Sequence, residues 1–415
     1  MEPHSHTLAR LPAGTVPRWV NRSVAGAVVA CMAVTLVGLV VLWPSRSRLP
    51  VPPGIGGPTH LISGTVSFTR SYSCRYTITP NSANAAPSQA KQTDCETSQV
   101  TVHNGPDRGQ QVSVDTNSAA GTASLHTGDR VLLTRDVGPD NKAIYEFVDF
   151  QRGQPLAWFG VIFAVIVVAV ARWRGIGALI GLGVTWLVLV RFLLPALLDG
   201  RNAFGVALVA SALILCLVLF IAHGFNARTA TALLGTLASL LLVGVLGLAA
   251  IAVSRLSGLA TEEAPYLQTV SGVQLRGLLL AGMVIGSLGV LNDMTVTQAS
   301  AVWELHLANP AQSLAGIYRS AMRIGRDHIA STVYTLVLAY AGAALPLLLS
   351  FDLAGRHFSD VVTSEIVAEE VVRTLVGSIG LVACVPLTTI LAAAVVTADR
   401  RRHTDPDIAT VVATS

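Results

Sequence analysis

The run from Ala203 to Ala222, with the sequence AFGVALVASALILCLVLFIA, decides the fold class of this chain. It carries no charged residue over 20 positions. About 20 apolar residues are what an α-helix needs to cross the roughly 30 Å of hydrocarbon in a bilayer. A helix at the surface of a soluble domain would show polar residues along one side instead. The run is therefore a candidate transmembrane helix.

Similar apolar blocks lie on both sides of this run. The composition agrees, because 52% of the residues are hydrophobic and only 13% are charged, whereas about a quarter are charged in soluble domains. We therefore expect an α-helical polytopic membrane protein and not a soluble enzyme. Its eight predicted transmembrane helices are Val24–Trp43, Ala157–Ala171, Ile176–Leu198, Ala203–Ala222, Ala230–Val253, Gly277–Leu291, Ile329–Ser350 and Leu375–Thr397.

The first block, Val24–Trp43, has a second interpretation as a cleaved signal peptide. It is longer than the apolar core of a usual signal peptide, and Trp43-Pro44 is a poor cleavage site. We therefore favour an uncleaved helix at residues 24–43. Residues 1–23 before it are polar and contain Pro12 and Pro17, which predicts a disordered tail.

The segment 44–155 differs from the rest of the chain because Ser, Thr, Asn, Gln, Gly and Pro replace the aliphatic runs. Alternating polar and apolar residues between turn signals predict a small β-rich domain, either a sandwich or a barrel, an OB-like barrel among them. Cys74 and Cys95 lie in this segment and form a candidate disulfide if the compartment is oxidising. The expected strands are His60–Phe68, Val100–His103, Gln111–Val114, Arg130–Thr134 and Ala143–Val148.

The arginines predict the orientation of the helices, because short cytoplasmic loops are enriched in Arg and Lys. This explains the formal charge of +4 without a nucleic-acid partner. Both termini are then cytoplasmic, the segment 44–155 is extracytoplasmic, a seven-helix membrane domain covers 156–398, and 399–415 is a cytoplasmic tail. The arginines placed inside are Arg10, Arg18, Arg22, Arg172, Arg174, Arg228, Arg319, Arg323, Arg326, Arg400, Arg401 and Arg402.

Two loops on the opposite side are acidic. One contains Glu262 and Glu263, and the other contains a group of carboxylates that includes Glu365, Glu369 and Glu370. Such loops could concentrate cations near a pore mouth. We favour the simpler interpretation, that both are ordinary solvated loops.

The segment after residue 282 carries small and polar residues against the hydrophobic pattern. Gly282, Gly286 and Gly289 recur at helical spacing and predict a small face where another helix backbone approaches closely. A helix-packing role is therefore expected for these three glycines.

Directly after the glycines, Asp293, Thr297, Ser300 and Glu304 recur at i, i+4, i+7 and i+11, which makes one narrow stripe on an α-helix. Asn292 lies beside it. Carboxylates in a membrane cost several kcal/mol unless they are paired or hydrated. We interpret these five residues as an ion or substrate pathway, and their oxygen atoms suit a cation or proton better than an anion. Residues 293–307 could line a cavity, form a re-entrant helix, or lie on the membrane surface.

Several enzymatic and cofactor signatures are absent from the sequence. It has no Walker loop, no His-Glu-x-x-His, no Gly-x-Ser-x-Gly and no Cys-x-x-Cys. A metal-dependent intramembrane hydrolase would find a histidine near Asp293 and Glu304 only at His306. We therefore expect no enzyme, no catalytic residue, no cofactor and no metal.

Two stretches resemble the YibE/F-like bacterial membrane proteins. The first is GSLGVLNDMTVTQAS at Gly286–Ser300, continuing to Glu304. The second is GRDHIASTVYTLVLAYAG at Gly325–Gly342, continuing to Leu345-Pro-Leu. The resemblance covers roughly residues 58–397. It implies a multi-pass protein of the bacterial inner membrane with an extracytoplasmic N-terminal domain, in a family whose activity is largely unassigned.

The family pattern has small residues that lead into an Asp and then a polar helix. Here this pattern falls on Gly286, Gly289, Asp293, Ser300 and Glu304. Asn292 and the threonine-rich stretch depart from it, so the resemblance does not carry over a substrate.

The leading functional hypothesis is an inner-membrane transporter or permease for a cation or a proton-coupled solute. The alternative is a non-transporting scaffold or sensor that couples the extracytoplasmic domain to a partner. The expected partners are the lipid bilayer and either a second copy of the chain or another protein that binds the extracytoplasmic domain. Substrate, energy source and oligomeric state stay open.

Overall fold

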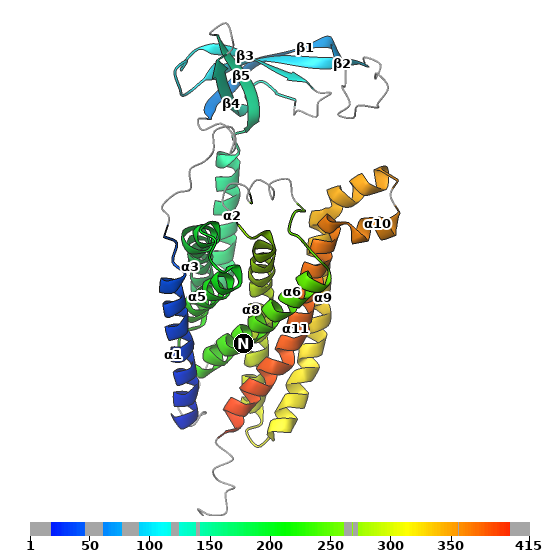
Figure 1. The fold of residues 1–415 in the computed structure, drawn as a ribbon. Helices are drawn as coiled ribbons and strands as arrows, with labels where there is room; N and C mark the ends of the chain where they lie inside the picture. Colours follow the sequence, from blue (N-terminus) through cyan, green and yellow to red (C-terminus); the bar gives the residue numbers. More distant parts are fainter. Residues whose placement is uncertain are drawn as a thin grey trace, which may run out of the picture. The chain divides into compact units, whose positions relative to one another are not determined.

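The computed structural model describes most of the chain and divides it into two compact units. The described residues are 18–45, 61–76, 91–117, 124–137, 142–260, 268, 273–355 and 357–398. One unit is Pro50–Val170, and the other joins Met1–Leu49 to Ala171–Ser415. Each unit is described by itself, and both are drawn in Figure 1.

The first unit is built on an antiparallel sheet in the order β3-β2-β1-β4-β5. The outer strands β3 and β5 also contact each other, so the sheet curls toward closure. This order and contact are those of an OB-like barrel, one of the architectures that the sequence left open. The strands are β1 Ile62–Tyr76, β2 Lys91–Val102, β3 Gln111–Asn117, β4 Arg130–Val137 and β5 Ala143–Phe150.

Alternating valines and leucines fill the centre of this sheet. Val66, Val100, Val114, Val131 and Leu133 are almost completely buried. Each such side chain stabilises the domain by roughly 1.5 to 3 kcal/mol relative to exposure. All five predicted strands are found, and β1 and β2 continue beyond their predicted ends as a longer hairpin.

This hairpin contains Cys74 and Cys95. Its register pairs Tyr72 with Cys95 and Cys74 with Thr93, so the two cysteines lie on adjacent strands and two residues apart in register. Cys95 is disulfide-bonded. The side chain of Cys74 lies outside the described residues, and the pairing of Cys74 with Cys95 therefore stays a prediction.

The sheet is followed by α2, Gly153–Ala171, in which no residue is buried. The second unit contains the remaining helices. They are α1 Arg18–Val41, α3 Trp173–Val188, η2 Leu189–Leu193, α4 Leu194–Leu198, α5 Ala203–His223, α6 Ala227–Val253, α8 Leu275–Ala308, α9 Leu314–Leu353, α10 Phe358–Thr363 and α11 Glu365–Thr397. Counting α3, η2 and α4 as one, eight helices of the described chain are long and apolar enough to cross a membrane. The predicted number is confirmed.

The helices α6, α8 and α11 all contact one another and form the centre of the second unit (Figure 1). Glycines allow this close approach. A Cβ on Gly380 of α11 would lie 2.2 Å from Val243 Cγ2, and one on Gly235 of α6 would lie 2.6 Å from Thr388 Oγ1. In lipid, where apolar burial gives little drive for helix association, such close packing is a main source of helix attraction.

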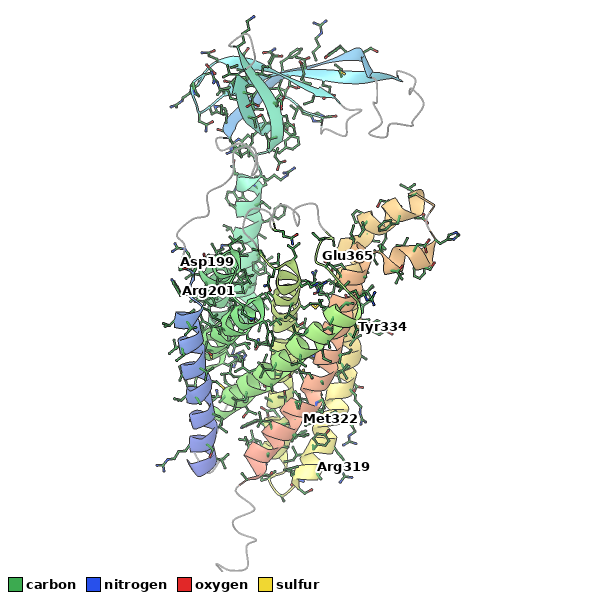
Figure 2. All side chains as sticks on the ribbon, in the orientation of Figure 1. Asp199, Arg201, Arg319, Met322, Tyr334 and Glu365 are labelled. Atoms are coloured by element: carbon green, nitrogen blue, oxygen red, sulfur yellow. The ribbon has the colours of Figure 1, made fainter. Side chains whose placement is uncertain are left out.

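Polar contacts tie neighbouring helix ends together. The backbone N–H and hydroxyl of Ser45 donate to Asp199 Oδ2 at 2.6 and 2.9 Å. The backbone N–H groups of Ser257 and Gly258 donate to Glu365 Oε1 at 2.7 and 3.1 Å. Figure 2 shows Asp199 and Glu365 toward one end of the helices, and Arg319 at the other end. The loop ends are thus held by specific side chains as well as by helix packing.

In the β domain, Asp107 accepts two side-chain hydrogen bonds on one oxygen. Arg135 Nε donates to Asp107 Oδ2 at 2.9 Å, and the Tyr145 hydroxyl donates to the same atom. These bonds, led by the one from Tyr145, hold the pKa of Asp107 below its ordinary value of 3.8. The two donors come from β4 and β5, so Asp107 links a loop to both strands.

We predict that acid weakens the β domain through Asp107. A carboxylate whose pKa is lowered on folding stabilises the folded state above its ordinary pKa, and this contribution is lost as the pH falls through the lowered pKa. Amide hydrogen exchange in β4 and β5 of the full-length protein, corrected for intrinsic rates, should therefore accelerate below about pH 4. Asp107→Asn should reduce this pH dependence, and Asp149 of β5, whose pKa is lowered by its hydrogen bond from Arg152, should account for what remains. Asp115→Asn should keep it, and an equal loss in both variants would contradict the assignment.

Candidate functional site

The polar stripe belongs to one continuous helix. α8 runs from Leu275 to Ala308 over 34 residues, about 51 Å at the α-helical rise, and Asp293 lies near its middle. The predicted span Gly277–Leu291 is therefore only the first half of this helix. Residues 293–307 show neither a re-entrant turn nor a separate surface helix.

The stripe lies on a face of α8 that is open along its length. The side chain of Asp293 is 72% exposed, Thr297 and Glu304 are exposed, and Ser300 is half-buried. The glycines continue the same face toward the start of α8, since Gly282, Gly286 and Gly289 precede Asp293 by 11, seven and four residues. One α8 face thus carries small residues in its first half and polar residues in its second.

No helix of the described chain packs closely on the glycines of this face. A Cβ added to Gly282 or Gly289 would meet no atom within 4 Å, and one on Gly286 would meet only the Tyr340 hydroxyl, at 3.3 Å. The predicted approach of another helix backbone to these glycines therefore stays a prediction.

Polar atoms gather at the middle of the α8 face. His328 Nε2 of α9 lies 4.0 Å from Asp293 Oδ2, and the two form an ion pair when the imidazole is protonated. Asn292 Oδ1 is buried and has no hydrogen-bond partner among the described residues, and His328 Nε2 also has none. The Asp293 carboxylate and the His328 imidazole at this distance could hold a water molecule between them or exchange a proton.

A buried polar network lies behind the stripe, on the inner side of α8. The hydroxyls of Thr295 and Thr236 are 2.6 Å apart. Gln298 Nε2 donates to the Ala321 carbonyl at 3.0 Å and to Thr389 Oγ1 at 2.7 Å. This network joins α8 to α6, α9 and α11. The sequence did not predict this network, because Thr295 and Gln298 lie off the stripe and their partners lie on other helices.

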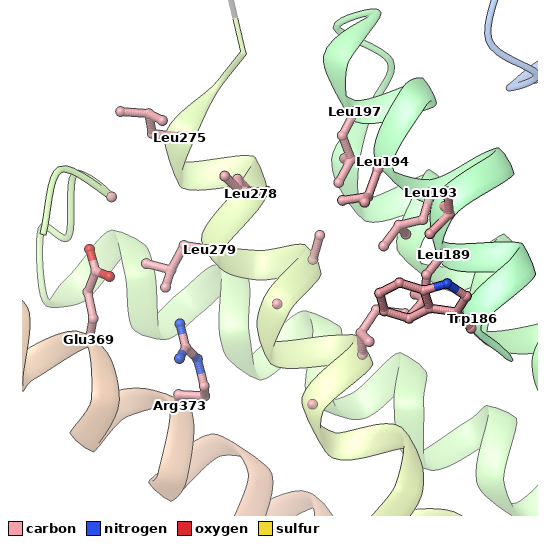
Figure 3. Close-up of a pocket in the computed structure, with 16 residues that line it drawn as sticks. Trp186, Leu189, Leu193, Leu194, Leu197, Leu275, Leu278, Leu279, Glu369 and Arg373 are labelled. Carbon is pink, nitrogen blue, oxygen red and sulfur yellow. The ribbon is translucent and has the colours of Figure 1, made fainter. Parts of the chain in front are cut away.

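A cavity of about 540 Å³ opens on the glycine half of the same face. Figure 3 shows Trp186 and a row of leucines from α3, η2 and α4 on one side and the start of α8 on the other. Gly282 and Gly286 line it, and α11 contributes Glu369 and Arg373. Its walls are therefore mostly apolar, with two ionisable side chains at one edge.

Glu369 is 7% exposed, and its Oε1 has no hydrogen-bond partner among the described residues. Arg373 Nη1 donates to Glu370 Oε1 at 2.5 Å, while its Nε is buried without a partner there. The favoured interpretation of this acidic stretch as a solvated loop is wrong for Glu369. The helix α11 begins at Glu365, ten residues before the predicted start, and places Glu369 inside the unit.

The described residues contain no group of three or more His, Cys, Asp or Glu side chains that could hold a metal ion. The open face of α8 carries polar side chains in its second half and adjoins a mostly apolar cavity in its first half. A model of the family described as YibE/F-like protein matches residues 159–398. The chain belongs to the YibE/F-like family. No curated protein and no solved structure matches it.

The YibE/F-like match begins within α2 and ends after α11, so it includes the stripe, the buried network and the cavity. The resemblance inferred from the sequence, over roughly 58–397, is confirmed for this part. The sheet of the first unit lies before the matched residues. The family assignment therefore concerns the helices.

We predict that Gln298→Leu weakens helix packing in this YibE/F-like chain. The substitution removes two interhelical hydrogen bonds, each worth about 0.6 kcal/mol in membrane proteins, so unfolding should become easier by about 1 kcal/mol. Thermal unfolding of the purified protein in detergent measures the difference. Thr297→Val, one residue earlier on the open face, should change stability by less than about 0.5 kcal/mol. Equal changes in stability for the two variants would show that the hydrogen bonds of Gln298 do not stabilise the helix packing.

Proposed function

We propose that this protein is a permease in which the open face of α8 forms part of an ion or proton pathway. The observation that carries the proposal is the continuity of that face. It runs from the cavity beside Gly282 and Gly286 to Asp293 and on to Glu304 without leaving one side of one helix.

The energetic cost of exposed carboxylates supports this proposal. Asp293 lies at the middle of a helix that is longer than the roughly 30 Å of bilayer hydrocarbon, and its side chain is largely uncovered by the rest of the chain. A carboxylate in contact with lipid at such a depth is strongly unfavourable, so it faces water or a partner in nearly all membrane proteins. A hydrated groove satisfies Asp293, Thr297 and Glu304 together.

The proposed setting is the bacterial inner membrane with both termini in the cytoplasm. The arginine distribution supports it, since Arg319, Arg323 and Arg326 lie at the α8–α9 end of the helices. The β domain would then be extracytoplasmic. A second copy of the chain is the proposed partner where the α8 face would otherwise meet lipid.

We predict that the double variant Asp293→Asn with Glu304→Gln lowers cation or proton flux. Fixed negative charge raises the local cation concentration and the rate of entry, so its loss should slow flux by about tenfold or more. Purified protein in liposomes, loaded with a pH-sensitive or cation-sensitive dye, gives the rate for H⁺, Na⁺ and K⁺ separately. Asp360→Asn, an exposed acidic residue outside the stripe, serves as the control. Unchanged flux in the double variant would remove the stripe from the pathway.

We predict that cysteines at Thr297 and Ser300 react with a water-soluble thiol reagent. The background protein has Cys31, Cys216 and Cys384 replaced, since these are its free cysteines among the described residues. Ala299→Cys is the control, because Ala299 is fully buried and should not react. Protection at all three positions would favour the alternative function, a scaffold or sensor whose α8 face is sealed against a partner.

A further inference from the structure

We infer that the cavity beside Glu369 is a binding site for an amphipathic organic cation, with an ammonium group at Glu369 and an apolar body along α8. The inference concerns binding and does not require that the protein transports anything. It rests on the state of Glu369, on the charges around it, and on the shape of the cavity.

Glu369 is the carboxylate at the start of α11 that keeps one buried oxygen, Oε1, without a hydrogen-bond partner among the described residues. Glu365 Oε1 accepts hydrogen bonds from the hydroxyl and N–H of Ser257 and from the N–H of Gly258. Glu370 is occupied by Arg373 at 2.5 Å. Glu369 Oε1, by contrast, is buried and has no such partner. A buried carboxylate oxygen without a donor costs free energy, so a donor from outside the chain would relieve Glu369 Oε1.

The charged side chains at this edge of the cavity favour a cationic ligand. Residues 365–373 of α11 contain three carboxylates, Glu365, Glu369 and Glu370, and one guanidinium, that of Arg373, so the start of this helix has an excess of negative charge. The Nε–H of Arg373 is also buried and has no hydrogen-bond partner among the described residues. A ligand with an ammonium group and a neighbouring acceptor atom would satisfy both side chains.

The size and the apolar lining of the cavity favour a ligand whose remaining part is apolar. A volume of about 540 Å³ lies within the range of small-molecule sites, roughly 300 to 1,000 Å³. Trp186 and Leu189 on one wall and Leu278 and Leu279 on the other are apolar (Figure 3). The wall also includes the π-helical turn η2, closed by a hydrogen bond from the Leu194 N–H to the Leu189 carbonyl, and such turns often occur at functional sites.

A lipid acyl chain is the main rival occupant. It would fill the apolar part of the cavity, but it offers no group to Glu369 or Arg373. An occupant that meets only the leucines would leave Glu369 Oε1 without a donor. Charge complementarity therefore favours the amine over the acyl chain.

The test compares three probes that share one body and differ in the head group. Tritiated 4-phenylbutylamine, 4-phenylbutanol and 4-phenylbutyrate are equilibrated with the full-length protein in nanodiscs. The amine should bind best, and Glu369→Gln should weaken it by about tenfold or more, since one hydrogen bond to a charged group is lost. Asp360→Asn should leave its binding unchanged. Equal binding of the alcohol and the amine, or binding unaffected by Glu369→Gln, would overturn the inference in favour of an apolar occupant, and preference for the butyrate would overturn it in favour of Arg373.

A second variant tests the location without touching the charge. Gly282→Leu adds a side chain where a Cβ meets no neighbour, so the fold should tolerate it while the cavity is filled. Gly289→Leu is its matched control, because Gly289 has equal space on the same face but does not line the cavity. Gly282→Leu should abolish amine binding and Gly289→Leu should not. Binding lost equally in both would overturn the site, and binding with no measurable flux would leave the site standing while the permease proposal fails.

Discussion

The contact of α8 with α6 and α11 is the interaction on which the membrane-helix unit depends. Apolar burial gives little net attraction between helices in lipid, so this contact relies on close backbone approach and on interhelical hydrogen bonds. Glycines supply the first at Gly247 of α6, where a Cβ would lie 2.8 Å from Leu280 Cδ1 of α8, and at Gly377 of α11, where one would lie 3.3 Å from Ser287 Oγ of α8. Gln298 and Thr295 supply the second. Because α8 is fixed on this inner side, its other side is free to present small and polar residues.

Hydropathy and alternation were enough to predict the number of long apolar helices and the positions of the five strands. Both are local properties, since a span is read from about 20 neighbouring residues and a strand from about six. Hydropathy and alternation do not predict the order of the strands in the sheet. The pairing of β1 with β4, and the contact of β3 with β5, depend on long-range packing that alternation does not encode.

The ends of the helices and the hydrogen-bond partners of buried polar side chains could not be predicted from local sequence either. Hydropathy ended one span at Leu291 and began another at Leu375, although the helices continue through polar residues to Ala308 and back to Glu365. Gln298 and Thr389 are 91 residues apart, so the local sequence around either residue does not predict the hydrogen bond between them. Glu369 looked like part of a solvated loop because its surroundings in sequence are polar. It is buried because residues distant in the chain, such as Gly258 and Leu275, line the same space.

The π-helical turn η2 determines which side chains the third membrane helix shows at its far end. Such a turn accommodates one residue more than an α-helical turn, and each residue of an α-helix advances by about 100°. Everything after η2 is therefore rotated by about that angle compared with an uninterrupted helix, which brings Leu194 and Leu197 round to the cavity side. Without the extra residue of this turn the helix would be a regular α-helix, and Leu194 and Leu197 would point away from the cavity. The width of the cavity therefore depends on whether this one turn is π-helical or α-helical.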